Sequence, residues 1–256
     1  MVFAETPVLC GHRGSGRGVV GGQRENTLGS YRAAVQAGVR WVEVDARLTS
    51  DDVLVARHDP VLDDGRFVAD LCAAETDALQ LMRVAELLAS LPLEVSVNVD
   101  VKSSLEDALR PAERTTAAVV ADLVVRESAR RRLLVTSFDP AALLIVRERA
   151  PAVALGLLTW INFPLRKAIA AAAHLRVDVV VPHVGSFALE HRERRMDREP
   201  PHSVRVAHEA GLQVAAWCPR PAEGDRLLDA GVDCLIVDDV PAAIAHYRAR
   251  SPGVSG

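Results

Sequence analysis

The strongest constraint on the fold is a repeated alternation of two kinds of segment. Short runs rich in Val, Leu and Ile alternate with Ala-rich stretches of helical periodicity along the 256 residues. The expected strands are 7–11, 40–49, 93–102, 132–137, 152–159, 178–182, 212–217 and 233–238. An accessory strand is expected at 53–57. Strands that alternate with helices in this number predict an α/β fold, a (β/α)₈ TIM barrel, and an open doubly wound sheet is the alternative.

Helices are expected between the strands, at 27–38, 82–90, 105–130, 140–150, 164–175, 203–211, 223–231 and 241–248. No break in composition divides the chain, so we predict a single domain over 1–256 with its core at about 7–249. The mixed-charge run 190–199 is expected to be a solvated loop or short helix, with a lid as the alternative.

Composition excludes several classes of partner. A net charge of −4 provides no positive surface for nucleic acid. The four cysteines (Cys10, Cys72, Cys218 and Cys234) are scattered singly, and this spacing fits neither a zinc motif nor a disulfide framework. No apolar run reaches the roughly 18 residues of a membrane span, so stable membrane insertion is not expected. We therefore predict a cytoplasmic protein.

The second expected strand contains two carboxylates of the same parity. Because side chains alternate faces along a strand, Glu43 and Asp45 project to one side while Val42 and Val44 project to the other. Two carboxylates in one small space repel each other unless a cation or proton lies between them, and oxygen ligands suit Mg²⁺ or Ca²⁺. An edge strand with a polar solvent face gives the same alternation.

The third expected strand repeats this polarity. Its valines hold one parity, and Asn98, Asp100 and Lys102 hold the other. In a barrel the valines would face the helices and the polar set the interior. An exposed strand outside a barrel would show the same pattern.

Two histidines complete the candidate site. His12 and Arg13 follow the first strand, and His58 follows the accessory strand. Functional groups of such barrels collect at the carboxyl ends of the strands, and histidine is the side chain best suited to move protons near neutral pH. Each histidine, taken alone, also fits a structural role.

In a series of short segments the chain resembles the glycerophosphodiester phosphodiesterase family. The matching segments are His12-Arg13-Gly14, Glu25-Asn26-Thr27, Glu43-Val44-Asp45, His58-Asp59, Asn98 to Lys102, Ser137-Phe138, Trp217, and Gly231 through Asp238. They occur in the family's order from near residue 8 to about 245. The series is specific, although His-Arg-Gly alone is common.

The resemblance implies a barrel enzyme that hydrolyses glycerophosphodiesters to an alcohol and glycerol 3-phosphate. It implies His12 and His58 as general acid and base, Arg13 and Lys102 as phosphate ligands, and Trp217 on the glycerol side. It also implies one divalent cation, Mg²⁺ or Ca²⁺, held by Glu43, Asp45 and Asp100. A substrate hydroxyl would attack phosphorus, and water would then open the cyclic product.

Two further hypotheses stay open. One is a related lipid phosphodiesterase of the phospholipase D or sphingomyelinase type, and the other is a catalytically silent barrel that binds phosphorylated ligands. The chain also departs from the family pattern: Asp100 stands where Glu is usual, and Cys218-Pro219-Arg220 follows Trp217 where Thr-Val-Asn is usual.

Overall fold

Eight parallel strands close into a barrel, which confirms the predicted fold class. The computed structural model describes residues 1–188 and 198–250. The barrel strands are β1 (Val8–Gly11), β4 (Trp41–Leu48), β6 (Ser96–Val101), β7 (Leu133–Ser137), β8 (Ala154–Leu158), β9 (Val179–Val181), β10 (Gln213–Trp217) and β11 (Cys234–Val237). They follow one another around the sheet, and β1 pairs with both β11 and β4, which closes the ring. The accessory strand β5 (Leu54–Ala56) runs antiparallel to β4.

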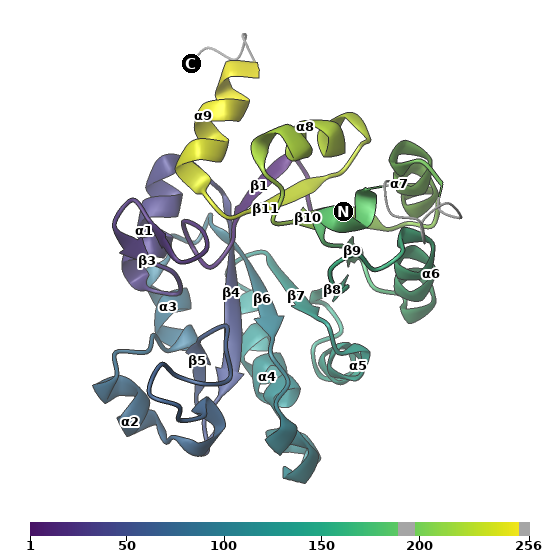
Figure 1. Cartoon of the computed structure of the whole chain (residues 1–256). Helices are drawn as coiled ribbons and strands as arrows, with labels where there is room; N and C mark the ends of the chain where they lie inside the picture. Colours follow the sequence, from purple (N-terminus) through teal and green to yellow (C-terminus); the bar gives the residue numbers. More distant parts are fainter. Residues whose placement is uncertain (189–197, 251–256) are drawn as a thin grey trace.

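Helices surround this barrel on the outside (Figure 1). They are α1 (Leu28–Ala37), α3 (Val84–Ser90), α4 (Thr116–Ser128), α5 (Pro140–Arg149), α6 (Leu165–Leu175), α7 (Pro200–Glu209), α8 (Pro221–Asp229) and α9 (Val240–Arg250). Local signals set their ends: Thr27 caps α1 by accepting a hydrogen bond from the Ser30 amide, and Gly38 ends it at φ 112°.

The prediction of one helix over 105–130 is wrong. That stretch forms two short 3₁₀ segments, Leu105–Leu109 and Ala112–Arg114, before α4 begins. Pro111 lies between the two segments and has no backbone N–H to continue a helix. Thr115 then caps α4, and the Asp107 carboxylate accepts from the Thr116 amide at 2.7 Å.

Several small elements were not predicted. They include the hairpin of β2 (Val19–Val20) with β3 (Gln23–Arg24), the helix α2 (Ala73–Ala78), and the 3₁₀ segments Val68–Asp70 and Val184–Phe187. The charged run 190–199 lies mostly outside the described residues. None of the helices within 1–188 and 198–250 combines the length and the apolar character needed to cross a bilayer.

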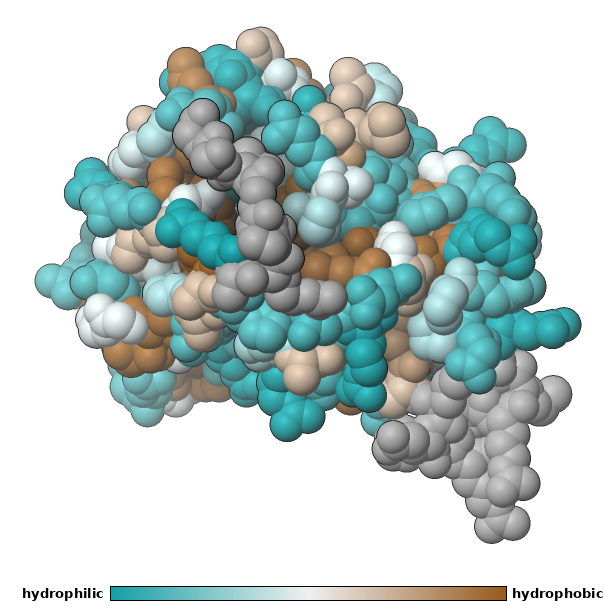
Figure 2. Space-filling view, turned by 90° about the horizontal axis from the view of Figure 1, so that it is seen from above, coloured by the Kyte–Doolittle hydropathy of each residue, from teal (hydrophilic) through white to brown (hydrophobic). Residues whose placement is uncertain are grey.

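Valine parity places the core as predicted. In β6 the side chains of Val97, Val99 and Val101 join the core cluster that also contains Val120 and Val124 of α4. Burying each such side chain contributes about 1.5–3 kcal/mol, so the outward valines hold the helices on the sheet. In the view of Figure 2, hydrophilic residues cover most of the surface and hydrophobic ones show mainly in its recessed parts.

The amino-terminal segment fills the bottom of the barrel. Phe3 is 2% exposed and packs edge-on against Trp41, with ring centroids 5.2 Å apart. The Gln213 carboxamide accepts from the amides of Val2 and Phe3 at 2.7 and 2.9 Å and donates to the Phe3 carbonyl at 3.0 Å. One side chain therefore satisfies three backbone groups that would otherwise be buried unpaired.

Replacement of this side chain should destabilise the barrel. We expect Gln213→Ala to lower the free energy of unfolding by about 1–3 kcal/mol, because it leaves buried backbone groups without partners. Urea unfolding followed by circular dichroism measures the change. The control is Gln36→Ala on the exposed face of α1, where a change within about 0.5 kcal/mol is expected. Equal stability of the two variants would contradict the role of Gln213.

Candidate active site

Three carboxylates from neighbouring strands meet inside the barrel. In the register of β4 and β6, Asp45 lies directly opposite Asp100 and Glu43 opposite Asn98. Glu43, Asp45 and Asp100 are 3%, 0% and 4% exposed, and one oxygen from each lies within 4.8 Å of the others. The predicted ligand set is thus together in one place.

The pKa values of the three neighbouring carboxyls shift in different directions. Burial and the charge of Asp45 raise the pKa of Glu43 to about 8. Burial acts in the same direction on Asp45, but Lys102 and Arg13 outweigh it and lower the Asp45 pKa. Desolvation also raises the pKa of Asp100. Additional positive charge between these oxygens would favour the ionised form of all three.

The donor set fits a hard divalent cation. All candidate ligand atoms are carboxylate oxygens, which Mg²⁺ and Ca²⁺ prefer. The Asp100 Oδ1 atom is buried and has no hydrogen-bond partner within the described chain. A buried oxygen without a donor is costly, and a cation at this position would remove that cost.

Two cations flank the carboxylates. The Arg13 Nε atom lies 3.3 Å from Asp45 Oδ2, and its terminal nitrogen donates to Glu25 Oε1 at 2.9 Å. Lys102 Nζ lies 3.0 Å from Asp45 Oδ1 and also pairs with Asp100. Their side chains are only 9% and 11% exposed. Both predicted phosphate ligands therefore lie beside the carboxylates.

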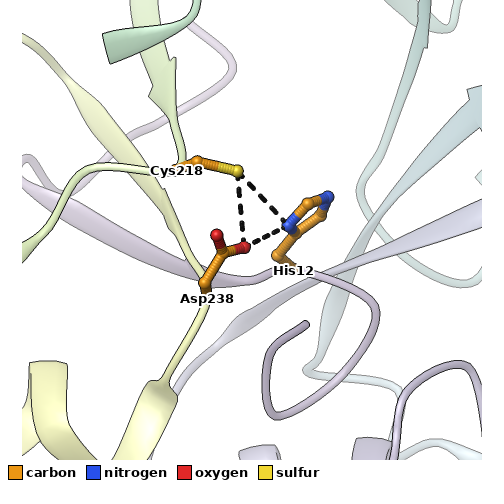
Figure 3. Close-up of side chains that lie close together, drawn as sticks. All are labelled: His12, Cys218 and Asp238. Carbon is orange, nitrogen blue, oxygen red and sulfur yellow. Dashed lines mark hydrogen bonds and ion pairs between the residues drawn. The ribbon is translucent and has the colours of Figure 1, made fainter. Parts of the chain in front are cut away.

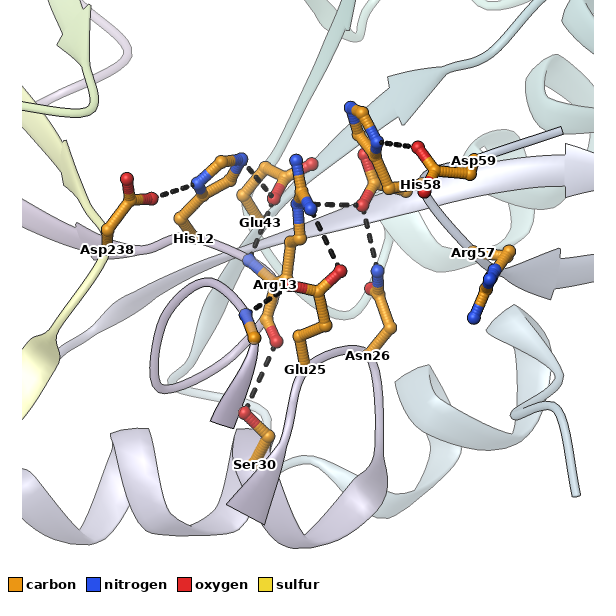
Figure 4. A network of polar contacts seen from close by, with 12 residues as sticks. His12, Arg13, Glu25, Asn26, Ser30, Glu43, Arg57, His58, Asp59 and Asp238 are labelled. Atoms are coloured by element: carbon orange, nitrogen blue, oxygen red, sulfur yellow. Dashed lines mark hydrogen bonds and ion pairs between the residues drawn. The ribbon is translucent and has the colours of Figure 1, made fainter. Parts of the chain in front are cut away.

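The two predicted histidines face the same cavity, each bonded to its own carboxylate. His12 Nδ1–H donates to Asp238 Oδ1 at 2.5 Å, and its Nε2 lies 3.9 Å from Glu43 Oε2. His58 Nδ1–H donates to Asp59 Oδ1 at 2.7 Å. In the view of Figure 4, Glu43 and Arg13 lie between these two His–Asp pairs. In each ring the bond at Nδ1 leaves Nε2 as the nitrogen available for chemistry.

The two imidazoles differ in basicity. Burial by itself lowers the pKa of His12, but the bond to Asp238, with smaller contributions from Cys218 and Glu43, raises it to about 10. Burial is the main influence on His58 and lowers its pKa. Near neutral pH the pair therefore contains one imidazolium and one neutral imidazole.

The strand β5 places His58. The Ala46–Ala56 pairing brings the chain back along β4, and the Arg57 amide donates to the Asp45 carbonyl at 3.2 Å. The Arg47 guanidinium then donates to the His58 carbonyl at 2.8 and 2.5 Å. These contacts fix the His58 backbone beside the strand that carries Glu43 and Asp45.

Two hollows meet at the site. One has a volume of about 260 Å³ and contains both histidines, Asp100 and Lys102 on one side. Its other side is an apolar wall in which Phe138 stacks on Trp160 at 4.5 Å and meets Trp217 edge-on at 5.9 Å. The other hollow, of about 640 Å³, is more polar. Arg13, Arg17 and His58 border both hollows.

Several supporting residues received no role from the sequence. Asp238 orients His12, and Glu25 holds Arg13. Asn26 donates to Asp45 Oδ2 at 2.8 Å and accepts from the buried Tyr31 hydroxyl at 2.7 Å. The segments Glu25-Asn26-Thr27 and Val237-Asp238 stood out in the sequence only as parts of a resemblance.

Comparison with known proteins identifies relatives along almost the whole chain. Residues 12–242 match the model of the glycerophosphoryl diester phosphodiesterase family. The protein named "Probable glycerophosphodiester phosphodiesterase 2" of Mycobacterium tuberculosis is 29% identical over 233 residues, which cover 83% of this chain and 81% of the relative. A glycerophosphodiester phosphodiesterase of Caldanaerobacter subterraneus is 26% identical over 265 residues. This match covers 94% of this chain and 98% of the relative.

A solved structure shares the fold. A phosphodiesterase of Oleispira antarctica, in complex with the product sn-glycerol-3-phosphate, superposes with a TM-score of 0.78 at 22% identity. The match covers 96% of this chain and 99% of that one.

Cation binding by the carboxylate group should be visible without an activity assay. We expect Ca²⁺ or Mg²⁺ to raise the unfolding free energy by about 2.7 kcal/mol at 100 times the dissociation constant, because only the folded chain gathers the three ligands. Denaturant unfolding with and without the cation measures this. Asp100→Asn should lose the effect, whereas the exposed Asp70→Asn should keep it. A stabilisation that persists in Asp100→Asn would exclude Asp100 as a ligand.

Proposed function

Because the chain belongs to the glycerophosphoryl diester phosphodiesterase family, we propose that it hydrolyses glycerophosphodiesters to an alcohol and glycerol 3-phosphate by two-histidine catalysis. The reaction class follows from the family: the protein is a phosphoric diester hydrolase. The observation that carries the finer proposal is that two carboxylate-bound imidazoles, the Arg13 and Lys102 cations and two carboxylates, Glu43 and Asp100, border one cavity. The Asp45 carboxylate lies buried within 4.8 Å of the other two.

Arg13 and Lys102 would bind the phosphate. Both are held rigidly by carboxylates, so little conformational entropy is lost when a phosphate oxygen reaches them. Phe138 and Trp217 would cover the glycerol carbons. The product complex of the Oleispira antarctica protein supports glycerol phosphate as the retained half of the substrate.

His12 and His58 would transfer the protons. In the resting protein His58 is the neutral ring and can accept a proton from the attacking hydroxyl. His12 is the protonated ring and can donate to the leaving alcohol oxygen. The roles reverse when water opens the cyclic intermediate. Asp238 and Asp59 hold the rings so that Nε2 carries the exchange.

Glu43, Asp45 and Asp100 would hold one Mg²⁺ or Ca²⁺. Such a cation supplies charge neutralisation at the phosphoryl oxygens. Asp45 also keeps Arg13 and Lys102 beside the carboxylates, so its replacement would disturb both the cation ligands and the phosphate ligands.

The partner would be a small glycerophosphodiester, with no nucleic acid and no stable membrane insertion. All four cysteines are free thiols, which supports a cytoplasmic location.

Loss of either imidazole should remove most of the activity. We expect His12→Ala and His58→Ala each to lower kcat on glycerophosphocholine or glycerophosphoethanolamine about 10²–10⁴-fold, because each positioned acid or base contributes about this much. The half-buried His202→Ala on α7, whose ring pairs with Arg205, is the matched control and should retain the rate.

Removal of the cation is a separate test. EDTA should abolish turnover, and added Mg²⁺ or Ca²⁺ should restore it. Near-full activity in either catalytic variant would refute the assignment, and no turnover with any cation would favour a silent binding barrel.

One observation favours a second candidate, a lipid phosphodiesterase. The apolar wall continues to Trp160 and Ile161, two residues that line the cavity and are 67% and 60% exposed. Glycerol phosphate alone offers little apolar surface for these two residues, whereas an acyl chain would cover them.

A lipid substrate would require the exposed apolar residues Trp160 and Ile161 for binding of its acyl chain. If the physiological substrate carries an acyl chain, Trp160→Ala should lower kcat/KM on lysophosphatidylcholine at least about 10-fold, since a buried aromatic contributes about 1.5–3 kcal/mol. The same variant should leave kcat/KM on glycerophosphocholine within about 3-fold. Equal effects on the two substrates, or no turnover of the lysolipid, would exclude this candidate.

A further inference from the structure

A second group of potential metal ligands lies behind the His12 ring. Figure 3 shows Cys218, Asp238 and His12 directed toward one another. Cys218 Sγ is 3.7 Å from His12 Nδ1 and 3.4 Å from Asp238 Oδ1, and Nδ1 is 2.5 Å from Oδ1. The group presents one sulfur, one nitrogen and one oxygen, unlike the all-oxygen group at Glu43, Asp45 and Asp100.

The spacing matches a tetrahedral zinc ion closely on two of three edges. With Zn–S of about 2.3 Å and Zn–N and Zn–O of about 2.0 Å, tetrahedral angles require sulfur edges of about 3.5 Å and an N–O edge of about 3.3 Å. The sulfur edges of 3.7 and 3.4 Å already meet this requirement. Only the hydrogen-bonded contact between His12 Nδ1 and Asp238 Oδ1 has to lengthen, by about 0.8 Å.

The backbone holds these side chains in place. The Cys218 amide donates to the Ile236 carbonyl at 2.9 Å, and the His12 amide donates to the Val237 carbonyl at 3.2 Å. The ends of β1, β10 and β11 are thus tied to one another where the ligands emerge. His12 and Cys218 both border the smaller hollow, so an ion can enter and a water can take its fourth position.

We propose that His12, Cys218 and Asp238 form a Zn²⁺ site whose occupation switches the enzyme off. On binding, the Cys218 thiol proton and the His12 Nδ1 proton pass to solvent, and zinc takes both positions. His12 then carries zinc on Nδ1 and its one remaining proton on Nε2. Loss of that proton would leave an imidazolate, so the ring is a far weaker acid than the imidazolium in the first step, and it cannot accept a proton from water in the second. The inhibitory effect rests on the proposed catalytic role of His12, whereas the binding site does not.

Ligand chemistry separates this site from the carboxylate group. Thiolate and imidazole ligands favour Zn²⁺ over Mg²⁺ and Ca²⁺, which prefer oxygen. An excess of Mg²⁺ should therefore fill the carboxylate group without displacing zinc from Cys218. The His12 ring lies between the two groups, with Nδ1 toward Cys218 and Nε2 toward Glu43.

Direct metal binding tests the site. The full chain is titrated with Zn²⁺ against a chromogenic chelator in excess Mg²⁺, and with Co²⁺ to detect the thiolate-to-cobalt charge-transfer band. We expect the band in the natural protein and in Cys72→Ser, whose thiol lies at the N-cap of α2 and is not part of the ligand group. Cys218→Ser should lack the band and bind Zn²⁺ at least about 10-fold more weakly. A band or zinc affinity that is unchanged in Cys218→Ser overturns the proposal.

Activity measurements separate the two proposals. Hydrolysis of glycerophosphocholine is measured with increasing Zn²⁺ in excess Mg²⁺, and each protein is compared with its own rate without zinc. We expect the inhibitory concentration to rise at least about 10-fold in Cys218→Ser and to stay unchanged in Cys72→Ser. Equal inhibition of all three proteins overturns the switch. Zinc bound through Cys218 with full activity retained would also overturn the switch, whereas the catalytic role of His12 is decided separately by His12→Ala.

Discussion

The burial of like charges is the constraint on which the site depends. Asp45 and Asp100 lie opposite each other in the β4–β6 register, with Glu43 one step away on the same face. Taking several carboxylates out of water is costly unless opposite charges accompany them. Arg13 and Lys102 supply those charges from positions just after β1 and β6. Glu25 bonds to Arg13 and Asn26 bonds to Asp45, which fixes the arrangement. The loops around the mouth thus have an electrostatic reason for their conformation.

The balance between burial and neighbouring charges also explains why the two histidines differ in protonation state. His12 is enclosed and bonded to Asp238, whereas the His58 side chain is 38% exposed and bonded to the solvated Asp59. Similar His–Asp pairs in different surroundings therefore have pKa values shifted in opposite directions. A protonated and a neutral imidazole arise from one residue type because burial is outweighed at His12 by Asp238 together with Cys218 and Glu43, whereas burial outweighs Asp59 at His58.

Much of the fold could be predicted because strand parity is a strong physical signal. The valines of β6 and the carboxylates of β4 identified the inward and outward faces, and the strand count identified the barrel. The helix prediction over 105–130 failed because it ran through Pro111, a helix breaker that the sequence itself displays. Asp238 was not assigned a role because its importance depends on a partner 226 residues away. Such long-range pairing leaves no local pattern in one sequence.

The antiparallel return of β5 along β4 has an evolutionary consequence. The Arg47 guanidinium donates to the His58 carbonyl, and the Arg57 amide donates to the Asp45 carbonyl. The His58 imidazole and the carboxylates of Glu43 and Asp45 are therefore carried by one hairpin. A substitution that shifts this hairpin would move all of them together. Divergence among descendants of this chain should therefore fall on the surrounding loops, which can reshape the leaving-group side while the hairpin is inherited as one block.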